Sequence, residues 1–215
     1  RKDFGLHVVI SSEVPVSAGL ASSAALEVAF AKLLSSVYGL RLDEKDIAEV
    51  AFRAENIGLG IPCGRLDQYG SSFGGVILLD CKPPYHVKPI PFKDLRFIVA
   101  DSGVRHSTAL IHPVRQDELN RGLEILMANK QLPEQLRKKL ALRYDKANWT
   151  TLSEDELTPF LSTLDDAARK RILFTLRMQK STVLALRVLE KRPSIEKVMV
   201  QAEKIPGLRD FIMVR

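Results

Sequence analysis

Two groups of residues in the first third of the chain are of types that carry phosphate chemistry. The first is the run Pro-Val-Ser-Ala-Gly-Leu-Ala-Ser-Ser-Ala-Ala at 15–25, where small residues separate an alternating apolar stretch from a stretch with helical spacing. The first backbone N–H groups of a helix have no partner within the helix, and the helix dipole is positive there. This turn therefore predicts a site for an anion such as phosphate, which small side chains allow to approach the backbone.

The second group is the turn Ile-Pro-Cys-Gly-Arg-Leu-Asp-Gln at 61–68, which brings one carboxylate and one amide to a second helix start. A carboxylate beside a substrate hydroxyl can accept its proton or orient it, as the catalytic base of a kinase does. Asp67 is therefore the candidate catalytic residue, although taken alone it is better explained as a helix-capping aspartate. We expect Gln68 to orient a neighbour or cap a helix. Cys63 has no His near it in sequence and is expected to pack in the turn.

Three further residues are weaker candidates. Arg105 follows an expected strand and a Ser-Gly turn, and its guanidinium suits phosphate or sugar oxygens. For His106, a solvated charge is an equal alternative to a binding role. Trp149 lies in a polar stretch and is expected to pack within a subdomain rather than to stack on a ligand.

These residues need an α/β framework to position them, and the pattern of the first hundred residues predicts one. We expect a strand at 6–14, helices at 20–38 and 44–57, and strands at 75–80 and 95–100. Asp43 is an expected N-cap of the second helix, and Gly58 and Gly60 end it.

Helical spacing dominates the second half of the chain, with helices expected at 113–128, 133–142, 154–161 and 165–191. We therefore expect two parts. Residues 1–100 form a phosphate-binding and catalytic α/β part, and residues 101–215 form a mostly helical part. The expected fold class is α+β.

Composition argues for an ordinary folded domain, with 215 residues, 46% hydrophobic and 27% charged. The net charge of +6 arises from basic residues scattered among acidic ones, so nucleic-acid binding is not expected. The most basic run, 169–180, is interleaved with apolar residues at helical spacing and predicts an amphipathic helix.

No membrane partner is expected either. Residues 19–40 reach membrane length but contain Glu27 and Lys32 and many small side chains, which favours a buried helix. The two cysteines provide neither a disulfide framework nor a metal cluster. With no targeting segment visible, the expected location is the cytoplasm.

Together, the two groups resemble the GHMP small-molecule kinases and, within them, the galactokinases. Residues 15–25 are similar to the phosphate-binding motif of that family. Ala54-Glu55 followed by residues 60–68 resembles the galactokinase active-site segment, and residues 79–81 and 101–107 are also similar. A weaker resemblance extends to about Gly207.

The resemblance implies a two-lobed α+β fold, with a mixed sheet and a mostly helical C-terminal subdomain. It implies ATP- and Mg²⁺-dependent phosphorylation of the C1 hydroxyl of galactose or a related sugar. Asp67 would face that hydroxyl, and Gly64, Arg105 and His112 would also bind the substrate. The phosphate-binding residues it implies are Pro15, Ser17, Ala18, Gly19, Leu20, Ala21, Ser22, Ser23 and Ala24.

Ser23 and Glu55 would bind the Mg²⁺, since a hard cation favours hydroxyl and carboxylate oxygens. An exposed acid near a helix C-terminus is an equal alternative for Glu55.

The chain departs from the galactokinases in two ways. It lacks their N-terminal segment with an arginine and a Glu-His pair, and their C-terminal Gly-rich loop, so we expect it to be part of a longer protein. His112 stands where galactokinases have a sugar-contacting tyrosine, which leaves heptose, uronic acid and mevalonate as alternative substrates. A non-catalytic sugar or nucleotide sensor is the alternative from another class. A monomer or a homodimer is expected.

Overall fold

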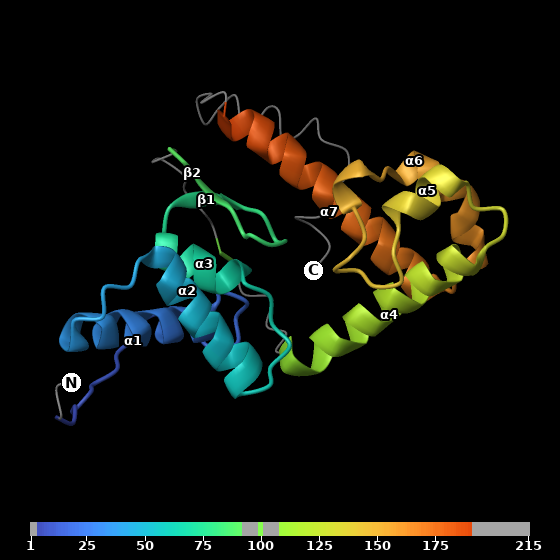
Figure 1. Cartoon of the computed structure of the whole chain (residues 1–215). Coiled ribbons are helices and arrows are strands. Elements are labelled where there is room, and N and C mark those ends of the chain that lie inside the picture. Colours follow the sequence, from blue (N-terminus) through green and yellow to red (C-terminus); the bar gives the residue numbers. More distant parts are fainter. Residues whose placement is uncertain (1–3, 92–98, 101–107, 191–215) are drawn as a thin grey trace. The chain divides into compact units, whose positions relative to one another are not determined.

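The computed structural model describes residues 4–91, 99–100 and 108–190. The chain divides into two compact units, Arg1–Ala109 and Leu110–Arg215. The first contains α1 (Ser22–Tyr38), α2 (Glu44–Arg53), the π-helical turn η1 (Ala54–Gly58), α3 (Leu66–Phe73), β1 (Val76–Leu79) and β2 (Val87–Ile90) (Figure 1).

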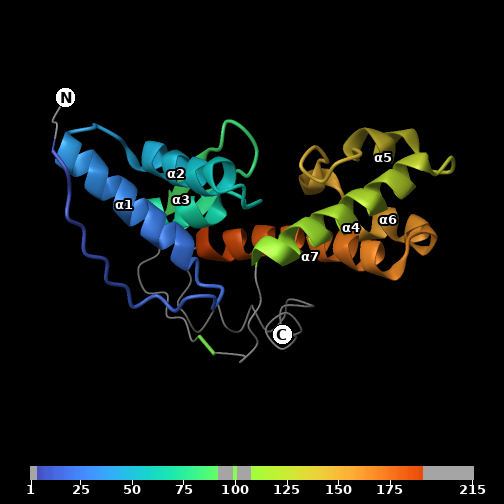
Figure 2. The ribbon, with the colours of Figure 1, turned by 90° about the horizontal axis from the view of Figure 1, so that it is seen from below.

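Helices α1, α2 and α3 pack against one another in the first unit (Figure 2). On α1, Val28 and Ala31 lie on one face and pack against Ile47 and Ala51 of α2. These four buried side chains are small or β-branched, so the two helix backbones can approach closely. The predicted helix at 20–38 is confirmed, with its first residue at Ser22.

Helix α2 begins where the sequence predicts, because Asp43 caps it. The Asp43 carboxylate accepts from the backbone N–H of Asp46 at 2.8 Å, and the Asp46 carboxylate accepts from the N–H of Asp43. The expected single helix at 44–57 is wrong in one respect. The α-helix ends at Arg53, and the backbone widens into η1, where the N–H of Leu59 bonds the carbonyl of Ala54 five residues earlier.

The sheet of the described residues is the antiparallel hairpin β1–β2, with Val76 opposite Ile90 and Leu79 opposite Val87. Strand β1 confirms the strand predicted at 75–80. Strand β2 was not predicted, because Pro89 interrupts its pattern; a proline is tolerated there on an edge strand. Helices with this sheet confirm the α+β class.

The strand predicted at 6–14 is wrong. Residues 4–14 have no strand conformation in the structure. A strand requires a hydrogen-bonded neighbour, and here Val9 is 95% exposed and Ile10 is 62% exposed. Alternating apolar side chains indicate a strand only where a neighbouring strand is available to form hydrogen bonds with it. Of the strand predicted at 95–100, residues 95–98 lie outside the described residues and 99–100 are not in a strand.

The second unit is helical in its described part. It contains α4 (Thr108–Ala128), α5 (Glu134–Lys139), the 3₁₀ turns η2 (Trp149–Thr151) and η3 (Thr158–Thr163), α6 (Glu154–Leu157) and α7 (Asp166–Glu190). These confirm the helices expected there, although residues 158–161 are 3₁₀ rather than α-helical. The core of the unit is formed by Leu119, Leu123, Leu126, Leu132, Leu136, Leu140, Ala147, Leu157, Leu161, Leu164, Ala168, Ile172 and Leu176.

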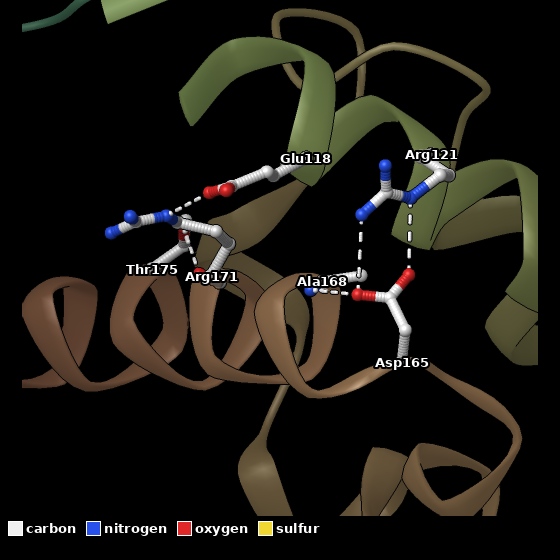
Figure 3. Close-up of polar contacts among 6 residues, drawn as sticks. All are labelled: Glu118, Arg121, Asp165, Ala168, Arg171 and Thr175. Carbon is white, nitrogen blue, oxygen red and sulfur yellow. Dashed lines mark hydrogen bonds and ion pairs between the residues drawn. The ribbon is translucent and has the colours of Figure 1, made fainter. Parts of the chain in front are cut away.

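Trp149 packs against this core, as expected, and its indole N–H donates to the carbonyl of Tyr144 at 2.7 Å. The basic run at 169–180 lies on α7 and forms the amphipathic helix that its spacing predicts. Figure 3 shows two charge pairs, one between α4 and α7 and one between α4 and the residue that precedes α7. Arg171 donates to Glu118 at 2.6 Å, and Arg121 donates to Asp165 at 3.0 and 3.2 Å.

Asp165 also caps α7 by accepting from the N–H of Ala168 at 3.0 Å (Figure 3). Within the described ranges, no helix is long and apolar enough to cross a lipid bilayer.

Candidate functional site

The turn before α1 has an unusual backbone. Ser17, Gly19 and Ala21 all have positive φ, at 58°, 72° and 55°. Only glycine adopts such angles without strain, so Ser17 and Ala21 are held there at a cost of about 1 to 3 kcal/mol each. Turns with left-handed residues bring successive backbone N–H groups to one side, which is how proteins form anion-binding concavities. This backbone is compatible with the phosphate cradle expected at 15–25, which stays a prediction.

The start of α1 lacks the features that usually neutralise a helix N-terminus. Its N-cap, Ala21, has no side chain able to accept a hydrogen bond, and the first turn contains no acidic residue. The first intrahelical bond runs from the N–H of Ala25 to the carbonyl of Ala21 at 3.0 Å. The N–H groups of Ser22, Ser23 and Ala24 therefore have no intrahelical acceptor and are suited to an anion.

Two carboxylates from different elements meet at the amide of Gln68. Its Nε2 donates to Glu55 Oε2 at 2.6 Å and to Glu27 Oε2 at 3.3 Å. Gln68 lies on α3 and is fully buried; Glu55 lies on η1 and is 8% exposed, and Glu27 lies on α1. Gln68 was expected to orient a neighbour or cap a helix, and it orients both carboxylates.

Burial first, and then the charge of Glu55, raise the pKa of Glu27, while the Gln68 hydrogen bond opposes the rise. In the part of the chain that the structure describes, no Lys or Arg forms an ion pair with Glu27 or Glu55. Two carboxylates without a cation form a site of negative potential.

Glu55 lies in the π-helical turn that follows α2 and is buried there. Its carboxylate accepts from Gln68. The alternative that Glu55 is an exposed acid is wrong, because the residue is 8% exposed. Asn56 fixes the following turn by donating to the carbonyls of Ile61 and Cys63 at 3.3 and 3.1 Å.

Cys63 is a free, half-buried cysteine in the turn that follows η1. Burial, the negative charge of Glu55 and a hydrogen bond to that carboxylate raise the pKa of the thiol to about 11. The thiol is therefore protonated at neutral pH, which agrees with the packing role expected from the sequence.

Asp67 lies in the first turn of α3, with its side chain exposed, and follows Gly64, which is also exposed. The turn between them is anchored by Arg65. Its Nε donates to Glu49 at 2.7 Å, and its guanidinium lies over the rings of Phe52 and Tyr85, 3.8 and 4.1 Å from their centroids. Such stacking and pairing fix the backbone on which Asp67 is presented.

The structure does not test the other expected substrate residues. Arg105 and His106 lie outside the described residues. His112 lies half-buried on α4, in the second unit. Sequence reasoning missed Glu27 and Glu49. For Glu27 a signal existed, since it follows Ser23 by four residues and so shares its helix face.

Comparison with known proteins supports the sequence resemblance. Residues 1–75 match the model of the GHMP kinases N-terminal domain. A galactokinase of Thermosipho africanus is 36% identical over 126 residues, which cover 56% of this chain and 36% of that protein. A galactokinase of Thermococcus kodakarensis is 29% identical over 208 residues, which cover 93% of this chain and 53% of that protein. An L-arabinokinase of Arabidopsis thaliana is 36% identical over 111 residues, half of this chain and 11% of that protein. The chain thus spans about a third of the first of these galactokinases and about half of the second.

Proposed function

Because this chain belongs to the GHMP kinase family through its residues 1–75, we propose that it is the phosphate- and hydroxyl-binding part of an ATP-dependent sugar kinase. The reaction is transfer of the γ-phosphoryl group to the C1 hydroxyl of galactose or a related sugar. The galactokinases and the L-arabinokinase among its relatives support a sugar as the acceptor.

One observation carries this proposal. Gln68, which directly follows Asp67, donates to Glu27 of α1, the helix whose first residues belong to the proposed cradle. A side-chain contact therefore joins the hydroxyl half and the phosphate half of the proposed site. The two residues that form it are 41 positions apart in the sequence. Phosphoryl transfer depends chiefly on positioning of donor and acceptor, so a contact that ties the two halves together supports the proposal.

The residues present suit a Mg²⁺ ion at the phosphate end. Glu55 and Ser23 offer the hard oxygen ligands that this cation prefers. The buried Oε1 of Gln68 has no hydrogen-bond partner, which is typical of a place where a water or an ion is bound in the working protein. When bound, the ion neutralises charge on the phosphate oxygens.

The chain's own residues have distinct roles in this proposal. The N–H groups at the start of α1 and the turn at 15–21 bind the β- and γ-phosphates. Asp67 accepts or orients the proton of the attacking hydroxyl. Gly64 contacts the sugar through its backbone, and Arg105 and His112 contact its oxygens.

The acceptor could be another small alcohol of the same family's range, such as a heptose, a uronic acid or mevalonate, because His112 replaces a sugar-contacting tyrosine. The proposed location is the cytoplasm, where ATP and free sugars meet. A monomer or a homodimer is the proposed assembly, and nucleic acid and membranes are not proposed as partners.

The test is the Asp67→Asn variant of the full chain, assayed for ADP release with ATP, Mg²⁺ and a panel of galactose, arabinose, galacturonic acid, a heptose and mevalonate. We expect turnover to fall by about 100-fold or more, because the variant loses a positioned acid–base group. Nucleotide affinity should be unchanged, because Asp67 is not part of the cradle.

Asp117→Asn is the matched control, since Asp117 is an exposed aspartate on α4 in the second unit. Equal turnover in the Asp67 variant and the parent would remove Asp67 from the mechanism. Absence of turnover with every acceptor, while the parent still binds ATP, would favour the sensor.

A further inference from the structure

The amide of Gln68 occupies a position where an apolar side chain would pack at lower cost. It is fully buried, yet only its Nε2 has partners, and its Oε1 has none. A buried acceptor without a partner costs free energy that a Leu or Met of similar size would not. Some gain elsewhere must offset this cost.

The orientation of the amide is set by charge. If its oxygen and nitrogen were exchanged, Oε1 would face the carboxylate oxygens of Glu27 and Glu55, and acceptor would meet acceptor. Both carboxylates therefore require Nε2 to point at them. An ionised carboxylate has no hydrogen-bond donor, so Gln68 is the shared donor that holds the side chains of Glu27 and Glu55 in place.

The arrangement also joins the elements that bear the proposed ligands. Glu27 lies one turn after Ser23 on α1, so the two side chains share a helix face with their Cβ atoms about 5 to 6 Å apart. Gln68 thus ties the helix of Ser23 to the turn of Glu55. The Glu55 carboxylate accepts from the neutral amide of Gln68, and among the described residues no Lys or Arg forms an ion pair with it.

From these contacts we infer that Gln68 is a positioning residue for the cation end of the site, and that Glu27 supports it by adding negative charge. This inference rests on the proposed function, in which Glu55 and Ser23 bind Mg²⁺. Gln68 itself does not touch the reacting atoms; it sets the distance and angle of Glu55 relative to α1. Residues that orient metal ligands in this way commonly change metal affinity by about 10- to 100-fold when replaced.

The test measures how strongly Mg²⁺ strengthens nucleotide binding. The affinity of the full chain for ADP is measured by calorimetry in EDTA and again in excess Mg²⁺, and the ratio of the two is the Mg²⁺ enhancement. For Gln68→Met, which keeps the volume but removes the donor, we expect the enhancement to fall about tenfold while the affinity in EDTA is unchanged. A merely structural role would lower both affinities together.

Gln135→Met is the matched control, because Gln135 is exposed on α5 in the second unit and should behave as the parent. Glu27→Gln is the second variant. Its amide oxygen can still accept from Gln68, so the fold is retained, but the lost charge should reduce the Mg²⁺ enhancement. If Gln68→Met does not fold, Glu27→Gln decides the question.

The outcomes separate this inference from the function on which it rests. A parent chain that binds no ADP overturns the proposed function and the inference with it. A parent with a clear Mg²⁺ enhancement that is equal in Gln68→Met, or in Glu27→Gln where the first variant is unfolded, overturns the inference alone. Reduced enhancement with normal affinity in EDTA supports it.

Discussion

At the scale of single residues, Glu49 is the acid on which the Asp67 turn depends. Its carboxylate accepts from Arg65 at 2.7 Å and from the hydroxyl of Tyr69 at 2.7 Å. Burial raises the pKa of Glu49, but the hydrogen bonds from Arg65 and Tyr69 outweigh it, so the pKa lies below its ordinary value of 4.5. The folded state therefore favours the ionised carboxylate.

This pKa shift gives a pH-dependent prediction for Glu49→Gln. A depressed pKa adds stability that is present above the ordinary value and lost as pH falls through the folded value. We expect the variant to be less stable than the parent by about 1 to 3 kcal/mol at pH 7. The difference should shrink as pH falls below 4.5.

Urea unfolding of both chains at pH 7 and at decreasing pH checks this expectation. Glu124→Gln is the control, because Glu124 is an exposed acid on α4. A difference between Glu49→Gln and the parent that stayed constant down to the acid limit of folding would mean that the Glu49 charge does not contribute.

At the scale of elements, the second unit depends on a close approach of α4 and α7 at Gly122. A Cβ built there would lie 3.0 Å from Cδ1 of Ile172 and 3.2 Å from Cβ of Ala168. Alanine at 122 gains about 1 kcal/mol of helix propensity. Overpacking against α7 costs about 1 to 3 kcal/mol, so we expect a net loss of stability from Gly122→Ala.

A double-mutant cycle with Ile172→Val tests the cause of that loss. Ile172→Val alone removes the methyl group that the new Cβ would meet, and costs about 0.5 to 1.5 kcal/mol. In the double variant the alanine methyl fills part of that space, so the combined cost should be smaller than the sum by about 0.5 kcal/mol or more. Thermal or urea unfolding of the parent, the two single variants and the double variant gives the coupling free energy. Additive losses of stability would mean that the contact between residues 122 and 172 is not the cause of the strain.

The longer helices of the described residues could be predicted from their periodicity, and some of them also have a recognisable start. The Asp43 cap and the apolar positions of α7 are local signals, and both are confirmed. Strands were less predictable, since residues 6–14 alternate without a partner and β2 contains Pro89. The π-turn at 54–58 has no sequence signature, so the burial of Glu55 could not be foreseen.

In the candidate site, too, the features with a local sequence signal were predicted and those that depend on distant contacts were not. Asp67 and the turn at 15–25 were proposed from residue type and spacing together with the family resemblance, and they stay predictions, while Gln68 was assigned a general orienting role. That Gln68 joins Glu27 to Glu55 depends on three elements meeting, the most distant contact spanning 41 residues. Pairings over such separations depend on packing of whole elements, and a single sequence does not encode them in a local pattern.

At the scale of the whole molecule, the two compact units have separate cores. The core of the second unit contains Leu157, which is fully buried, and the chain's one tryptophan packs against it. The fluorescence of Trp149 therefore reports unfolding of that unit. In the first unit, Ile47 is 3% exposed between α1 and α2.

We propose that the catalytic α/β part and the mostly helical part expected from the sequence unfold as distinct cooperative units. Leu157→Ala should then lower the stability seen by Trp149 fluorescence by about 2 to 5 kcal/mol, because it leaves a cavity in the core that the indole contacts. Ile47→Ala should leave that transition in place while weakening ADP binding, since it loosens the helix that bears the cradle. Equal shifts of the Trp149 transition in both variants would mean that the chain unfolds as one cooperative unit, in which the helical part shares the stability of the catalytic part.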